Sequence, residues 1–167
     1  LVVGIPALIA QILGLIFMIG TGDVPSISGI IAFLICGQIM IFTLVSFQLC
    51  FAISARNGSD VVMYGIGMWL LFAVIWNLLI YVISFILGID VTADDFENDP
   101  KFQAIASHLG MLNPAYVYQF SVGLLTHRTL AIDLEGIPGW LILLALVLWP
   151  LACLKTATRM FKREIRG

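Results

Sequence analysis

The stretch Val61–Gly88, VVMYGIGMWLLFAVIWNLLIYVISFILG, decides the fold of this chain. It contains no Asp, Glu, Lys or Arg, and it follows the short polar segment SARNGSD at residues 54–60. About 20 apolar residues, at a rise of about 1.5 Å each, carry a helix across the hydrocarbon core of a bilayer. Because lipid cannot bind backbone amides, a helix is expected here despite the many Ile, Val and Phe residues. The stretch is longer than the minimum and therefore predicts a tilted or projecting membrane helix.

This helix has two distinct stripes at helical spacing. The first is largely aromatic and consists of Gly65, Trp69, Phe72 and Trp76. The second is small or polar and consists of Asn77, Tyr81, Ser84 and Gly88. Small and polar residues mediate contacts between membrane helices. We therefore expect Asn77, Tyr81 and Ser84 to face other helices or to line a pathway, with plain packing as the simpler interpretation. Part of the aromatic stripe should reach lipid or a partner subunit.

The composition places the whole chain in the membrane class. Its 167 residues are 61% hydrophobic and only 11% charged, whereas soluble domains carry about 25% charged residues. The predicted fold class is all-α, a polytopic membrane helix bundle in a single domain. Its four transmembrane helices are expected at about 1–20, 27–53, 60–88 and 138–155. Gln38 and Gln48 in the second span are expected to bind neighbouring helices or to line a polar pathway.

The segment 89–137 between the third and fourth spans differs from the rest. It opens with the acidic run IDVTADDFENDP and continues with apolar residues at helical spacing. Asn113 followed by Pro114 is typical of a helix start. We expect two short amphipathic helices separated at this pair, each too short to span. They are predicted to lie at the membrane surface or to dip into it. A re-entrant pair is not favoured, because its backbone would need shielding by protein.

The distribution of charge predicts the orientation. The turn at 54–60 and the tail at 156–167, with Lys155 just before it, hold six of the eight Lys and Arg residues. Basic residues mark the cytoplasmic side of a membrane protein. The C-terminus should therefore be cytoplasmic, and the acidic segment should lie outside.

No catalytic pattern appears in the sequence. HExxH, GxSxG and P-loop patterns are missing, and no Asp or Glu lies in the middle of a predicted span. Cys36, Cys50 and Cys153 all lie in apolar runs, where thiols behave as small hydrophobes. We therefore expect no enzymatic activity, no metal site, no directly bound cofactor and no nucleic-acid partner.

The order of these features resembles a known family. A short turn of the SARNGSD type precedes a long span with the Trp76–Asn77 pair. LNPAYVYQ at 112–119 follows in the outer segment, and FKREIRG at 161–167 ends the chain. This order resembles the ABC-2 type permease subunits, and most closely the branch of the permease of nitrous-oxide reductase maturation. Members have six spans, so the resemblance and the start at Leu1 predict a fragment holding the third to sixth.

The resemblance implies an ATP-driven exporter in the cell membrane. Two permease copies would form the pathway, and a separate P-loop ATPase subunit would bind and hydrolyse the ATP. Arg56 and Asn57 would then belong to a turn that faces the ATPase. The alternative is a non-transporting membrane scaffold or assembly protein held together by the same packing residues. A neighbouring ATPase gene would favour the transporter, and a lone gene would favour the scaffold.

Overall fold

The computed structural model describes the chain except residues 1–3, 21–25, 94, 127–133, 135 and 167. The regular elements of the described residues are all helical, which confirms the predicted fold class. Their bounds are α1 (Gly4–Gly20), α2 (Ile27–Ser54), α3 (Gly58–Leu70), the π-helical segment η1 (Leu71–Ile75), α4 (Trp76–Ile86), the short 3-10 helix η2 (Phe96–Asn98), α5 (Pro100–Gly110), α6 (Pro114–Thr126) and α7 (Gly139–Arg166).

Three helical stretches of the described chain are long and apolar enough to cross a membrane. They are Ile27–Ser54, Gly58–Ile86 and Gly139–Arg163, and they lie close to the predicted second, third and fourth spans. The predicted first span corresponds to α1, a 17-residue helix whose apolar part is Leu8–Phe17. The last helix runs on through the basic tail to Arg166.

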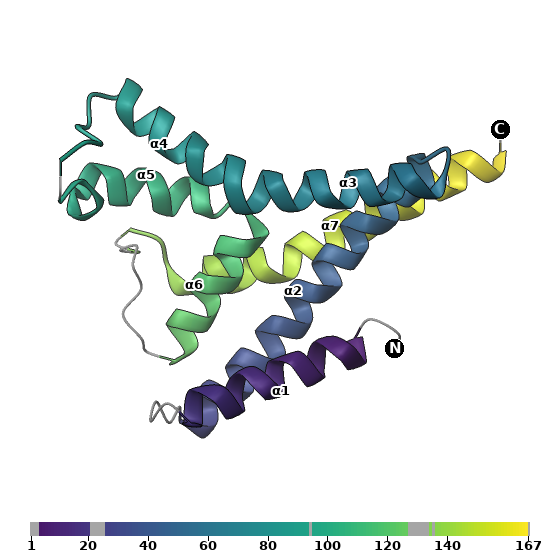
Figure 1. Cartoon of the computed structure of the whole chain (residues 1–167), viewed down its shortest axis with the longest axis horizontal. Coiled ribbons are helices and arrows are strands. Elements are labelled where there is room, and N and C mark those ends of the chain that lie inside the picture. The colour runs from purple at the N-terminus through teal and green to yellow at the C-terminus, as the bar shows by residue number, and fades with distance from the viewer. Residues whose placement is uncertain (1–3, 21–25, 94, 127–133, 135, 167) are drawn as a thin grey trace.

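The helices α3, η1 and α4 form one continuous rod, which we call the α3–α4 rod (Figure 1). At the end of the π-helical segment the backbone N–H of Trp76 donates to the carbonyl of Leu71, five residues earlier. This widened turn occupies the middle of the rod, because Phe72 is midway between Gly58 and Ile86. Single π-helical turns inside α-helices are frequent at functional sites.

Side-chain caps fix the turn between α2 and the rod. The Asn57 side chain accepts a hydrogen bond from the Asp60 backbone N–H at 2.9 Å. In return, the Asp60 carboxylate accepts one from the backbone N–H of Arg56 at 3.1 Å. This reciprocal capping satisfies donors that a helix start leaves open. It allows α2 and the rod to be joined by three residues, and it leaves Arg56 exposed.

The segment after the rod folds into two short helices, which we call the α5–α6 hairpin. In Figure 1, α5 returns alongside α4, and α6 then turns towards α2 and α7. The side-chain oxygen of Asn113 accepts a hydrogen bond from the Ala115 N–H at 2.9 Å. Pro114 is the first residue of α6. The predicted break between two helices at Asn113–Pro114 is therefore confirmed.

The hairpin packs against the other helices of the bundle, while its place relative to the membrane surface stays a prediction. Its turn reaches the middle of the rod, where the Asn113 side chain donates to the Phe72 carbonyl at 2.9 Å. Val117 in α6 is fully buried in a cluster with Cys36 of α2 and Leu146 of α7. The neighbouring helices thus supply the shielding that a re-entrant backbone needs. The hairpin is inserted into the bundle from one end.

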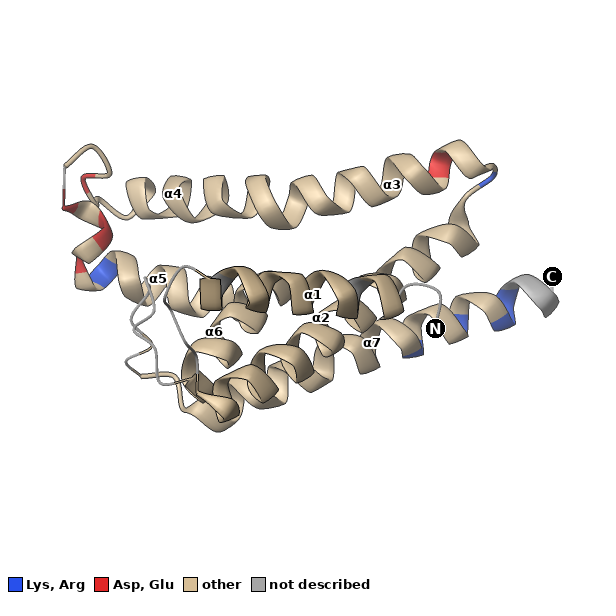
Figure 2. Cartoon of the chain, turned by 60° about the horizontal axis from the view of Figure 1, so that its bottom comes forward, with Lys and Arg blue, Asp and Glu red and all other residues tan. Residues whose placement is uncertain are grey.

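Charged residues separate to the two ends of the bundle (Figure 2). The end where α4 meets α5, which we call the acidic end, carries Asp90, Asp95, Glu97, Asp99 and Lys101. The opposite, basic end carries Arg56, Asp60, Lys155, Arg159, Lys162 and Arg163. The remaining acidic and basic residues of the predicted loops lie outside the described residues, and these are Asp23, Asp94, Arg128, Asp133 and Glu135.

Candidate functional site

The two amides that the sequence singles out in α2 lie at contacts between helices. Gln38 donates to the side-chain oxygen of Gln11 in α1 at 2.8 Å. Gln48 donates to the backbone carbonyl of Val61 in α3 at 2.9 Å. A Cβ atom at Gly37 would lie 1.5 Å from Gln11 Nε2, so a larger residue there would require the Gln11 side chain to move. Both amides therefore join α2 to a neighbouring helix, at separate places.

The π-helical segment and the hairpin turn stabilise one another. A wider turn leaves carbonyls without the usual α-helical partner, and lipid offers no replacement. Two carbonyls of this segment accept from side-chain amides: Asn113 donates to Phe72 O at 2.9 Å, and Asn77 donates to Ala73 O at 2.7 Å. Asn113 is 0% exposed, so its own polar groups depend on these protein partners.

The Trp76–Asn77 pair also faces the hairpin. The indole N–H of Trp76 donates to the carbonyl of Leu109 at 3.2 Å. The side-chain oxygen of Asn77 accepts a hydrogen bond from the Tyr116 hydroxyl. The aromatic stripe of the rod is therefore divided, because Trp69 is 63% exposed whereas Trp76 is half-buried against α5.

The other two polar residues of the rod lie nearer the acidic end. The Tyr81 hydroxyl lies 3.4 Å from a carboxylate oxygen of Glu97. Ser84 is 0% exposed, and its hydroxyl has no hydrogen-bond partner among the described residues. Its backbone carbonyl accepts from the N–H of Ile89, which closes the end of α4. Ser84 thus lies in the packed end of the rod.

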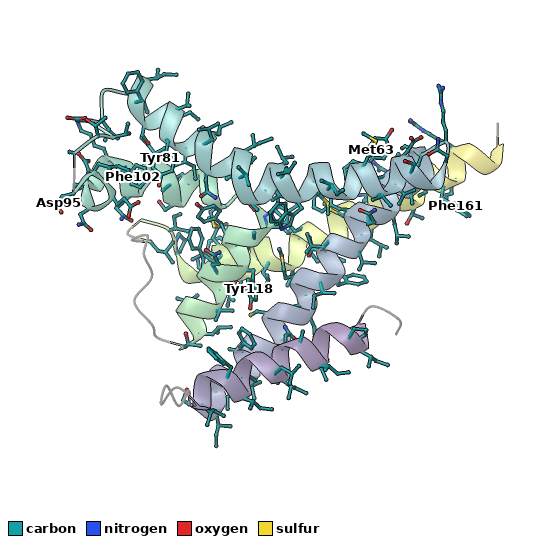
Figure 3. All side chains as sticks on the ribbon, viewed as in Figure 1. Met63, Tyr81, Asp95, Phe102, Tyr118 and Phe161 are labelled. Atoms are coloured by element: carbon teal, nitrogen blue, oxygen red, sulfur yellow. The ribbon has the colours of Figure 1, made fainter. Side chains whose placement is uncertain are left out.

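A cavity of about 230 Å³ lies between α4, α5 and α6. Tyr81 of α4 and Phe102 of α5, which both line it, lie close together near the acidic end (Figure 3). Its lining combines phenols, amides, one carboxylate and apolar side chains. These are Asn77, Ile80, Tyr81, Glu97, Phe102, Gln103, Ala106, Tyr116, Gln119 and Phe120.

An aromatic cluster lies at the side of this cavity that is nearer the acidic end. The ring centroids of Tyr81 and Phe102 are 5.8 Å apart, and those of Tyr81 and Phe96 are 5.6 Å apart. Phe96 and Phe102 meet edge to face at 5.1 Å. Such aromatic pairs stabilise a fold by about 0.5–1.5 kcal/mol beyond their burial. The cluster therefore ties η2 and α5 to the end of α4.

Some of the residues that the sequence analysis expected at a pathway line this cavity, and others do not. Asn77 and Tyr81 line it, whereas Gln38, Gln48 and Ser84 do not. Sequence reasoning missed its four other polar lining residues, Glu97, Gln103, Tyr116 and Gln119. Their polar character on short amphipathic helices was visible, but only the insertion of the hairpin brings them to the rod. No His or Cys is among the described residues that line the cavity.

We expect Asn77→Leu to lower the free energy of unfolding by about 0.5–2 kcal/mol, because it removes an interhelical hydrogen bond. Tyr116→Phe deletes the same bond from the other side and should cost a similar amount. The double variant should then cost less than the sum of the two, since the bond can be lost only once. Unfolding in mixed micelles measures all three. Full additivity would contradict the Asn77–Tyr116 contact.

Comparison with known proteins agrees with this architecture. The sequence matches a family model described as ABC-2 family transporter protein over residues 1–165. The match includes the three long apolar helices, the π-helical segment and the hairpin. No curated protein and no solved structure matches the chain.

Proposed function

Because the chain belongs to the ABC-2 transporter family, we propose that it is the permease through which a separate P-loop ATPase drives export. As a family member it is a membrane component of an ABC transporter and is not itself catalytic. The observation that carries the proposal is the family match over nearly the whole chain. The sequence supports it, because it contains no P-loop of its own and no carboxylate in the middle of a span.

The transport cycle proposed here is alternating access. A second permease copy packs against this chain, and closure of the ATPase subunits rearranges the helices around the pathway between them. Large apolar side chains such as Phe17, Trp69 and Phe85 are exposed on the chain alone and are available to lipid or to the second copy. The α3–α4 rod crosses the bundle from the basic end to the cavity, so it is the element that would carry movement between them.

The turn between α2 and α3 is the proposed ATPase contact. It is short, it lies at the basic end, and its Arg56 side chain is exposed while Asn57 fixes the backbone. We expect the full-length protein to co-purify with the ATPase and to transport only when that ATPase is active. Arg56→Glu should lower coupled ATP hydrolysis about threefold, because a reversed charge at an interface rim weakens association.

The control for this experiment is Lys162→Glu, which reverses a charge in α7 at the same end. It should leave coupling nearly unchanged. Pull-down followed by ATPase assays in lipid measures both variants. If the full-length protein recruits no ATPase and its gene has no ATPase neighbour, the exporter proposal fails and a membrane scaffold replaces it.

We further propose that the basic end and the C-terminus are cytoplasmic in the cell membrane. The motivation is the segregation of charge along the bundle (Figure 2). In a background without Cys36, Cys50 and Cys153, a cysteine at Asp95 should react with an impermeant maleimide in intact cells. A cysteine at Lys162 should react only after lysis. The reverse pattern would overturn the orientation.

A further inference from the structure

We propose that the cavity between α4, α5 and α6 binds the ammonium group of a small organic cation, with Glu97 as its counter-ion. Glu97 is the only charged residue among the described side chains that line the cavity. Its carboxylate lies beside the Tyr81 hydroxyl, at 3.4 Å. The proposal concerns binding by this chain and does not depend on the ATPase.

The charge around the cavity favours a cation. Asp90, Asp95 and Asp99 lie in the same acidic end as Glu97. Lys101 is the only Lys or Arg in the sequence between Asn57 and His127. A cleft lined and flanked by one sign of charge raises the local concentration of the opposite sign. Anions are correspondingly disfavoured.

The lining favours an organic cation over a metal ion. Ca²⁺ takes about 6–8 oxygen ligands with several carboxylates, and Mg²⁺ requires a near-ideal octahedral site. Among the described residues no three His, Cys, Asp or Glu side chains gather into a possible metal site. The cavity instead carries four aromatic rings, from Tyr81, Phe102, Tyr116 and Phe120. Aromatic rings around a carboxylate are typical of sites for alkylammonium groups.

The backbone around Glu97 is held by contacts that need no ligand, while its side chain is exposed at the mouth of the cavity. The amide of Gln103 in α5 donates to the Glu97 backbone carbonyl, which joins η2 to α5. The aromatic cluster fixes the neighbouring Phe96 against Tyr81 and Phe102. The volume of about 230 Å³ is below the range of about 300–1,000 Å³ usual for drug-sized ligands. The site therefore fits a head group or a small cation.

The binding test uses purified full-length protein in nanodiscs made only of phosphatidylglycerol, which contains no ammonium group. Equilibrium dialysis measures binding of choline and of its neutral carbon isostere, dimethylbutanol. We expect saturable choline binding about tenfold tighter than binding of the isostere, because charge and cation–π attraction act only on choline. Absence of choline binding, or equal binding of the isostere, would overturn the proposal.

Single substitutions test whether choline binds in this cavity. Glu97→Gln should weaken choline binding about tenfold, and Tyr81→Leu should weaken it about fivefold, whereas Tyr81→Phe keeps the ring and should retain most of it. The matched control is Asp95→Asn, which removes an exposed acid of the same end that does not line the cavity. It should change affinity by less than about twofold, since Asp95 does not line the cavity whereas Glu97 does. Thermal unfolding of each variant separates lost binding from lost folding. An equal effect of Asp95→Asn and Glu97→Gln would contradict the assignment to Glu97.

The ammonium group could come from a free cation or from a phospholipid head group. Repeating the dialysis in phosphatidylcholine nanodiscs distinguishes these sources. Suppressed choline binding, with the lipid retained by wild type but not by Glu97→Gln, identifies the head group as the occupant. Unchanged binding identifies a free cation.

Discussion

Replacing Asn113 by aspartate is expected to lower the free energy of unfolding by about 3 kcal/mol, because a fully buried donor is lost. In the native structure the Asn113 amide donates to Phe72 O, while its oxygen accepts from the Ala115 N–H. Aspartate keeps the acceptor that caps α6 but sets a carboxylate oxygen against the Phe72 carbonyl. The π-helical segment then loses the partner that the hairpin turn provides.

The pH dependence of the stability of Asn113→Asp tests whether the lost hydrogen bond to Phe72 O causes the deficit. At low pH a protonated aspartate regains a donor for Phe72 O, so its deficit relative to wild type should shrink as the pH falls. Asn98→Asp is the matched control, since Asn98 is exposed at the end of η2. It should change stability by less than about 0.5 kcal/mol. Denaturant unfolding in micelles at two pH values measures both. A deficit in Asn113→Asp that does not change with pH would count against the contact with Phe72.

Gly110→Val is the second large effect, and we expect a loss of about 3 kcal/mol in the free energy of unfolding. A Cβ atom at Gly110 would lie 2.8 Å from Cζ and 2.9 Å from Cε2 of Phe120. Phe120 is only 2% exposed and packs against Ile137 and Ile142, so its ring has little room to move. The substitution should therefore force α5 and α6 apart at the turn of the hairpin.

Two further variants separate this clash from the general effect of valine in a helix. Gly67→Val places the same side chain where no atom lies within 4 Å of the added Cβ, so it should have little effect. Phe120→Leu shortens the obstructing side chain and should recover part of the loss in a double variant with Gly110→Val. Thermal unfolding in one detergent compares wild type, Gly110→Val, Gly67→Val and the Gly110→Val/Phe120→Leu double variant. Equal losses at Gly67 and Gly110 would show that the Phe120 contact is not the cause.

Local sequence patterns identified the long helices well. A charge-free apolar run predicts a membrane helix almost regardless of its neighbours, so α2, the α3–α4 rod and α7 were visible from hydropathy. Capping chemistry is equally local, and Asn57 and Asn113 have the roles typical of residues that begin a helix. The family resemblance was also readable, because it follows from the order of spans and turns. Its closer resemblance to the nitrous-oxide reductase branch stays a prediction.

Features that depend on distant contacts were not predictable. The π-helical segment has no sequence signal of its own, since Leu71–Ile75 are ordinary apolar residues. Its Phe72 carbonyl finds a partner 41 residues later, in Asn113. The depth of the hairpin depends likewise on the burial of Val117 between α2 and α7. A short amphipathic helix has the same pattern whether its apolar face meets lipid or protein, so Glu97 and Tyr116 could not be assigned to one cavity.

The inserted hairpin also sets an order of events during biosynthesis. The ribosome makes α5 and α6 before α7, yet the buried face of α6 is completed by Leu146 of α7. Until α7 enters the bilayer, the buried face of α6 lacks one of the helices that cover it. Docking of the hairpin is therefore a late step of assembly, and a nascent chain arrested before α7 should still expose it to quality-control proteases.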